Sequence, residues 1–192
     1  MLRLGFIAVL LLSLGALALP AQAQSQSIWQ RPTSSRDTDE ERNPDWDKYA
    51  FELPVLGEPG SLSFEELVTD GQATVLFFWL ADCPLCHLQM PYVEQFKQLA
   101  DENGLPVRVV GINVDQRESD AEDYVAEKQP TFEMLFDGNA RRTADPYDVD
   151  DLGCPLVYVF NSDGEYVESI SGFKSNLSKV VLKLLDLEIP EK

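Results

Sequence analysis

Runs of apolar and polar positions along residues 49–192 predict strands that alternate with helices. Residues 75–80 and 107–114 are almost continuously apolar, which is typical of strands covered on both faces. Apolar residues then recur at helical spacing over 93–100, just ahead of the helix-ending pair Asn103-Gly104. Shorter strands are predicted at 132–136, 156–160 and 165–170, and further helices at 119–128, 139–147 and 177–185.

Turn and capping residues define the borders of several elements. Gly57-Glu58-Pro59-Gly60 separates residues 51–56 from 61–63, which predicts an N-terminal hairpin. Ser119-Asp120-Ala121-Glu122 has the form of a capping box and predicts a helix start, with Pro130 as the stop. Strands followed by helices, then a closing hairpin and a helix, imply a central sheet with helices on both faces.

The first 23 residues have the layout of a secretory signal peptide. Arg3 precedes an apolar run from Leu4 to Leu19, and Ala21-Gln22-Ala23 supplies a small-residue cleavage site. The run is somewhat shorter than the roughly 20 residues that span a bilayer. An uncleaved membrane anchor is the alternative interpretation. In both cases we expect the rest of the chain to be exported, periplasmic in a bacterial cell, where disulfides persist.

Residues 24–48 form a polar and acidic segment between this signal and the domain. The segment contains little apolar surface besides Ile28, Trp29 and Trp46, so we expect a flexible leader. Docking through Trp29 or Trp46 is the alternative. One compact domain is predicted for residues 49–192.

Composition narrows the class of function. The chain carries 33 acidic residues against 15 basic residues, a net charge of −18 at pH 7. This surplus argues against a nucleic-acid binder that works by phosphate neutralisation, and favours a role in solubility. Three cysteines are too few for a disulfide-scaffolded miniprotein, so each must be interpreted individually.

Cys83-Pro84-Leu85-Cys86 lies where the apolar strand gives way to a helix. Two cysteines three positions apart in a first helical turn are close enough to form a disulfide, and the leading sulfur faces unpaired N–H groups and the positive end of the helix dipole. The free N–H groups and the helix dipole both favour the thiolate form of the leading cysteine. Cys83 is therefore the predicted nucleophile, and Cys86 is the predicted resolving thiol. Pro84 suits the first helical position.

The same residues permit two other interpretations. With His87, the motif also reads C-x-x-C-H, the attachment motif for c-type haem, although a buried strand and an amphipathic helix are a poor context for haem. Cys83, Cys86, Cys154 and His87 would together suit copper or zinc, as in a metal carrier, if they converged in the fold.

Trp79 to Cys86, followed by Met90-Pro91, resembles the active-site segment of the TlpA/ResA-like thiol-disulfide oxidoreductases of the thioredoxin superfamily. The order of predicted elements matches the thioredoxin fold, a central mixed sheet flanked by helices, here with the N-terminal hairpin and an inserted βα unit. The resemblance implies a cis-proline at Pro155, a substrate groove formed by Cys154, Pro155 and Trp79, and a helix kink at Pro91.

The resemblance also implies an activity and its partners. These are disulfide exchange with protein thiols, in cytochrome c maturation or in disulfide reduction, and a soluble or membrane redox partner. Membrane association is expected only through an uncleaved N-terminal segment. The redox group would be the Cys83–Cys86 disulfide, with no further cofactor and no metal.

Several positions depart from the family pattern. The family commonly has Cys-x-Pro-Cys, whereas the proline comes first here, which leaves the redox direction open. Phe77 stands where many thioredoxins carry a buried acid, two residues before the strand tryptophan. Asp82 and His87 are candidates to tune the pKa of Cys83, in opposite directions. Cys154 is either a small packing residue or a third redox thiol or metal ligand.

Overall fold

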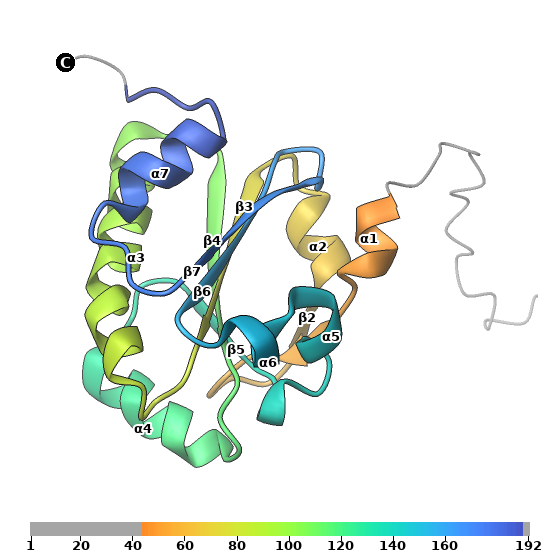
Figure 1. Ribbon diagram of the computed structural model, residues 1–192, viewed down its shortest axis with the longest axis vertical. Coiled ribbons are helices and arrows are strands. Elements are labelled where there is room, and N and C mark those ends of the chain that lie inside the picture. Colours follow the sequence, from red (N-terminus) through yellow and green to blue (C-terminus); the bar gives the residue numbers. More distant parts are fainter. Residues whose placement is uncertain (1–43, 190–192) are drawn as a thin grey trace, which may run out of the picture. The chain divides into compact units, whose positions relative to one another are not determined.

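The structure is a computed structural model that describes residues 44–189. The signal segment and most of the predicted leader lie outside the described residues. Five strands form the main sheet in the order β5-β4-β3-β6-β7, and β1 and β2 form a separate antiparallel pair (Figure 1). The strands are β1 (Glu52–Pro54), β2 (Ser61–Ser63), β3 (Ala73–Trp79), β4 (Val107–Asn113), β5 (Glu133–Phe136), β6 (Leu156–Phe160) and β7 (Tyr166–Ser171).

The helices enclose this sheet from both sides. They are α1 (Pro44–Lys48), α2 (Phe64–Val68), α3 (Pro84–Asn103), α4 (Glu118–Lys128), α5 (Ala144–Tyr147), α6 (Val149–Leu152) and α7 (Leu177–Leu184), with a 3-10 turn at Gly138–Ala140. Parallel pairing of β3, β4 and β5 combines with antiparallel pairing of β3, β6 and β7. The mixed sheet and flanking helices confirm the predicted thioredoxin fold.

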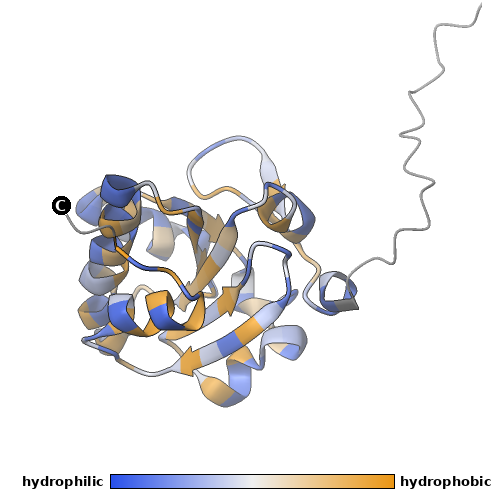
Figure 2. Cartoon of the chain, turned by 90° about the horizontal axis from the view of Figure 1, so that it is seen from above, coloured by the Kyte–Doolittle hydropathy of each residue, from blue (hydrophilic) through white to orange (hydrophobic). Residues whose placement is uncertain are grey.

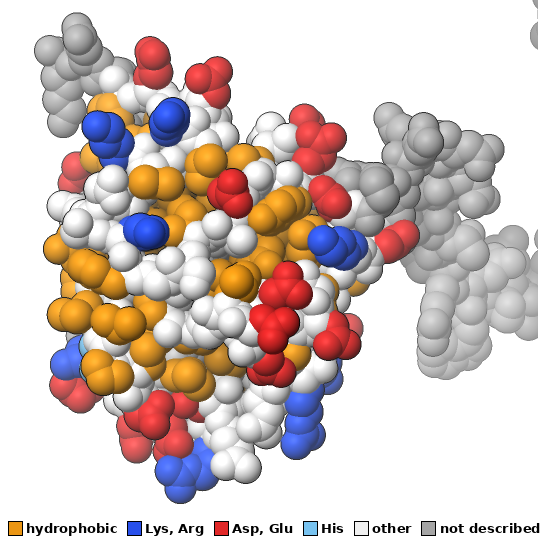
Figure 3. Space-filling view, in the orientation of Figure 1, with side chains coloured by type: hydrophobic (Ala, Val, Ile, Leu, Met, Phe, Trp, Pro, Cys, Tyr) orange, Lys and Arg blue, Asp and Glu red, His pale blue; other side chains and the backbone are white. Residues whose placement is uncertain are grey.

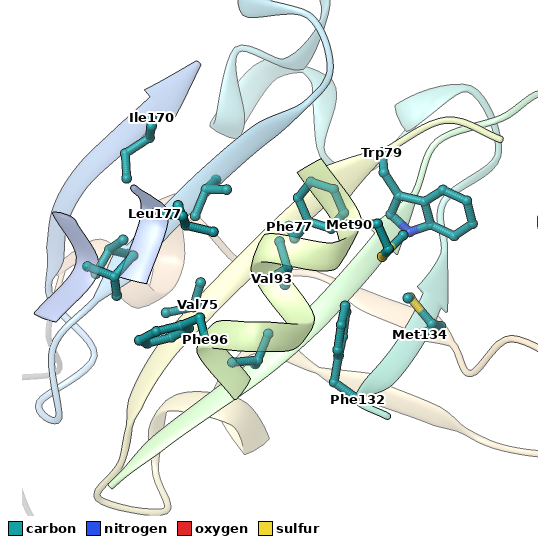
Figure 4. Packing of buried hydrophobic residues seen from close by; sticks show 14 of the residues in the cluster. Val75, Phe77, Trp79, Met90, Val93, Phe96, Phe132, Met134, Ile170 and Leu177 are labelled. Carbon is teal, nitrogen blue, oxygen red and sulfur yellow. The ribbon is translucent and has the colours of Figure 1, made fainter. Parts of the chain in front are cut away.

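Strand β3 separates two hydrophobic cores. Val75, Phe77 and Trp79 face α3, α4 and α7, whereas the alternating Leu76 and Phe78 face α1, α2 and α5. Every residue of β3 is buried, as the continuous apolar run predicted. Figure 4 shows the first core, with the labelled β3 side chains lying beside those of α3, and Figure 2 shows hydrophobic residues concentrated along the strands.

Three local predictions need correction. Helix α4 begins one residue before Ser119, after Arg117, and no side chain caps it; Ser119 therefore lies inside the helix. The capping box is instead at Ser63 and Glu66, where it starts the unpredicted helix α2. The helix predicted over 139–147, with a break at Pro146, is instead a 3-10 turn and the short helix α5. The left-handed residues Asn139 and Ala140 interrupt it, and Pro146 lies inside α5.

The predicted leader boundary at residue 48 is also too late. Residues 44–48 form helix α1, and Trp46 packs on the second core. The carboxylate of Asp45 accepts the N–H of Tyr166 at 2.8 Å. Docking through Trp46, the alternative considered for this segment, is what the structure shows. Within residues 44–189, no helix combines the length and apolar character needed to cross a bilayer.

Gly164 should be a sensitive position for the docking of α1. Its φ is +73°, and an added Cβ would contact the Trp46 indole nitrogen and lie 2.9 Å from Val68 Cβ. We expect Gly164→Ala to lower the free energy of unfolding in urea by about 2–4 kcal/mol, through strain and overpacking. Gly57→Ala is the control, because Gly57 has a φ of +74° but open space around it, and should lose only about 1 kcal/mol. Equal losses for both variants would contradict the packing of α1 against this turn.

Candidate active site

The start of α3 carries the candidate site, directly beyond the buried end of β3. Cys83 is the N-cap residue, with extended backbone (φ −87°, ψ 110°), and Pro84 occupies the first helical turn, where its missing N–H costs no hydrogen bond. The N–H of Cys83 donates to the Leu80 carbonyl at 3.3 Å, and the Cys83 carbonyl accepts the N–H of His87 at 3.1 Å. The backbone therefore fixes the first cysteine at the helix entrance.

The Cys83 thiol contacts two segments that are distant in sequence. Its Sγ accepts the N–H of Cys86 at 3.2 Å, as an N-cap side chain does, and lies 3.6 Å from the Cys154 carbonyl. The Cys154–Pro155 peptide bond is cis, as the resemblance implied. The first turn of α3 and the loop before β6 therefore meet at one sulfur atom.

Cys86 lies behind Cys83 and is fully buried. Its side chain is hydrogen-bonded to the thiols of both Cys154 and Cys83. The bond to Cys154, together with burial, raises the pKa of Cys86 far above its ordinary value. All three cysteines are free thiols here, and Cys86 contacts both of the others.

Ionisation of Cys83 is harder than the sequence suggested. Burial, and after it the hydrogen bond to the Cys86 thiol, raises the pKa of Cys83 to about 11, because the N–H groups of Cys86 and Leu85 lower it by less. The prediction that Cys83 readily forms a thiolate is therefore wrong for this arrangement. Donors at a helix start stabilise a thiolate, but here desolvation outweighs them.

Asp115 is a site residue that the sequence reasoning missed. It is buried just beyond the carboxyl end of β4, and its carboxylate accepts the N–H of Ala81 at 2.7 Å and the Asn113 side-chain amide at 2.7 Å. A charged acceptor of this kind stabilises a hydrogen bond by about 1.5–3 kcal/mol. Asp115 thereby holds the loop that presents Cys83. The sequence offered one signal for this role, because Asp115 and Gln116 directly follow the apolar run 107–114.

Aromatic rings support the first turn of α3 from the side of α4. Tyr124 lies 4.9 Å from Trp79 and 5.0 Å from the His87 ring, measured between ring centres. Trp79 is fully buried, so the prediction that it lines a substrate groove is wrong; it packs beneath the site. The His87 ring is hydrogen-bonded to the Ala81 carbonyl. Tyr124 was missed, although its spacing from Ala121 marks the inner face of α4.

A second polar clamp joins α3 to the loop after β7. The buried Gln89 side chain accepts the N–H of Lys174 at 2.6 Å and donates to the Lys174 carbonyl at 3.3 Å. The same loop donates from Gly172 N–H to the Pro155 carbonyl at 2.9 Å. These bonds set the position of the Cys154–Pro155 segment relative to α3, and the sequence reasoning did not foresee them.

The predicted tuning residues and the metal alternative have less structural support. Asp82 and His87 are exposed, and the largest influences on the pKa of Cys83 are its burial and the groups of Cys86 and Leu85. Tuning by Asp82 or His87 stays a prediction. Among residues 44–189, no group of three or more His, Cys, Asp or Glu side chains is arranged to hold a metal ion.

Exposed apolar side chains lie on the segments that carry the thiols or bond to them. Leu85 is 48% exposed, Leu152 40% and Phe173 37%. Leu152 is joined to the end of β7 because its carbonyl accepts the Ser171 hydroxyl at 3.0 Å. In the view of Figure 3, apolar side chains cover much of the visible surface, and acidic side chains are grouped over α6. A partner that reached Cys83 would therefore meet apolar surface with acidic groups beside it.

Known proteins share this fold and parts of this sequence. The chain is 27% identical to the thiol-disulfide oxidoreductase ResA of Oceanobacillus iheyensis over 123 residues, which are 64% of this chain and 62% of the relative. It is 25% identical to the thiol:disulfide interchange protein DsbE of Escherichia coli K12, over 59% of this chain and 57% of that protein. The chain thus spans less than two thirds of these relatives.

A solved structure and a family model agree with the sequence relatives. The structure of MTB dsbF in its mixed oxidized and reduced forms matches with a TM-score of 0.60 and 23% identity, over 71% of this chain and 96% of that chain. At this identity the match shows the fold. The family model described as Redoxin matches residues 49–181, more than half of the sequence. The chain therefore belongs to the Redoxin family.

Proposed function

We propose that this protein is an exported thiol-disulfide oxidoreductase that acts on protein substrates through Cys83 and Cys86. One observation carries the proposal: Cys83 Sγ sits at the entrance of α3, 3.2 Å from the Cys86 N–H, with the Cys86 thiol hydrogen-bonded behind it. An accessible thiol with a second thiol within reach is the arrangement that disulfide exchange requires. The redox group is the Cys83–Cys86 pair, without a further cofactor.

The chemistry consists of two exchange steps. The Cys83 thiolate attacks one sulfur of a substrate disulfide, so that a mixed disulfide forms and the other substrate sulfur leaves as a thiolate. Cys86 then loses its proton and attacks Cys83 Sγ, which forms the Cys83–Cys86 disulfide and releases the second substrate thiolate. The substrate gains two electrons and the protein loses two. The reverse sequence oxidises a dithiol.

The surface around Cys83 favours an extended protein segment as substrate. Leu85, Leu152 and Phe173 offer apolar contacts, and the Cys154 carbonyl lies at the position where a neighbouring backbone N–H could donate. Substrate contact is assigned to Cys83, Cys154 and these exposed side chains. Pro155 is buried and shapes the loop from below.

The environment of Cys83 favours the direction of disulfide reduction. Strongly oxidising exchange proteins stabilise the thiolate of their reduced form, which makes the disulfide easy to reduce. Here burial raises the pKa of Cys83 to about 11, so the thiolate gains no such stabilisation. The oxidised pair is then the comparatively stable form, and the protein works as a reductant.

The proposed cell location rests on the sequence, and the proposed clients rest on that location. The signal-like segment at residues 1–23 supports export to the periplasm or beyond, with a soluble or membrane protein as the source of electrons. Reduction of cysteine pairs in apocytochromes, or of wrongly paired disulfides generally, fits such a location. The arrangement of the described residues gives the competing copper or zinc carrier no support.

Substitution of each cysteine separates the two steps. We expect Cys83→Ser to abolish the reduction of a peptide disulfide, because no accessible nucleophile remains at the helix entrance. Cys86→Ser should still attack and then accumulate a covalent mixed disulfide through Cys83, visible as a stable adduct by intact-mass spectrometry. If Cys86→Ser releases its Cys83 mixed disulfide as fast as the wild-type protein does, Cys86 is not the resolving thiol.

The reactivity of Cys83 should depend steeply on pH. Only the thiolate reacts with iodoacetamide, so a pKa of about 11 predicts that the alkylation rate of the reduced protein rises about tenfold per pH unit from pH 7 to 9.5. At pH 7 the rate should fall below that of glutathione. Peptide mapping identifies Cys83 as the modified residue, and circular dichroism checks the fold at each pH. A rate that levels off below pH 8 would contradict the raised pKa.

A further inference from the structure

Cys154 is a third thiol in the site, and the two-step exchange described above does not use its sulfur. It is partly buried on the loop before β6, next to Pro155. Its carbonyl contacts Cys83 Sγ at 3.6 Å, while its side chain is hydrogen-bonded to the Cys86 thiol. Cys154 therefore contacts both members of the redox pair, one through its backbone and the other through its sulfur.

Cys86 is hydrogen-bonded to two other thiols. Among residues 44–189, the hydrogen-bond partners recorded for its side chain are the thiols of Cys83 and Cys154 and the backbone of Leu80. The nearby Asp115 carboxylate is engaged by Ala81 and Asn113, and the His87 ring is bonded to the Ala81 carbonyl. The Cys86 thiol thus has a second thiol, that of Cys154, within hydrogen-bonding reach besides that of Cys83.

We propose that Cys154 is a third redox-active cysteine, which exchanges disulfide partners with Cys83 on the shared sulfur of Cys86. The proposal rests on the function proposed above. In the step, the Cys154 thiolate attacks Cys86 Sγ of the Cys83–Cys86 disulfide. The Cys86–Cys154 bond forms, the Cys83–Cys86 bond breaks, and Cys83 leaves as a thiolate that takes up the proton lost by Cys154. No net oxidation or reduction occurs, so no further reactant is needed.

This exchange would separate the nucleophile from the stored disulfide. With the Cys86–Cys154 bond formed, Cys83 is again a free thiol at the helix entrance while the molecule remains oxidised by two electrons. An oxidised molecule could then attack a substrate disulfide through the Cys83 thiolate, whereas a molecule that holds the Cys83–Cys86 disulfide has no free thiol at that position. The third thiol thus adds isomerisation of substrate disulfides to reduction.

The test uses Cys83→Ser, which leaves Cys86 and Cys154 as the only cysteines. Serine is a good N-cap residue and should preserve the start of α3. On treatment with oxidised glutathione, we expect both thiols to be lost and a peptide linked through Cys86–Cys154 to dominate the non-reduced mass map. Glutathione attached first to either cysteine leaves as a thiolate when the other attacks.

The matched control is Cys83→Ser/Cys154→Ser, which should yield no intramolecular link. In the wild-type protein, acid quenching and mapping should reveal the Cys86–Cys154 peptide beside the Cys83–Cys86 peptide. Glutathione retained on Cys86 or Cys154 of folded Cys83→Ser, with no linked peptide, would overturn the third-thiol proposal. It would leave the proposed oxidoreductase function intact, since that function fails only if the wild-type protein does not exchange with a substrate disulfide.

Discussion

The hydrogen bond from the Cys86 N–H to Cys83 Sγ is the interaction on which the site depends. It exists because Cys83 caps α3 and because a fully buried strand, β3, delivers the chain to that point. A hydroxyl or carboxylate side chain usually caps the start of a helix, but here the cap is Cys83 Sγ, the proposed nucleophile. The same geometry places the second thiol one turn further inside the protein.

The clamps around this bond come from elements that are far apart in sequence. Asp115, after β4, holds the N–H of Ala81, and Gln89, within α3, holds the backbone of Lys174 after β7. Together they fix the loop before Cys83 and the segment beside Pro155. Buried polar bonds on a rigid sheet thus hold the thiol-bearing segments in place.

Burial sets the chemistry of the thiols as strongly as the helix start does. The N–H groups at α3 favour a thiolate at Cys83, but removal of the sulfur from water disfavours it by more. Cys86, which is hydrogen-bonded to Cys154 and fully buried, is still harder to ionise. This balance is the basis for the proposal that the protein acts as a reductant.

The sequence predicted the features that depend on local pattern and missed those that depend on tertiary contact. Apolar runs located β3 and β4, and the spacing of Cys83 and Cys86 located the site. The roles of Asp115 and Gln89 depend on partners 34 and 85 residues away, and no local pattern reveals them. The pKa of Cys83 was misjudged for the same reason, because desolvation depends on the packing of the whole site.

The most direct test of the central claim is a thiol-trapping redox titration of the purified protein against glutathione, with bound copper and zinc quantified on the same sample. A two-electron transition that involves Cys83 and Cys86, at a potential more reducing than the glutathione couple and with no stoichiometric metal, is the predicted result. Stoichiometric metal on the cysteines, with no two-electron transition, would contradict the account.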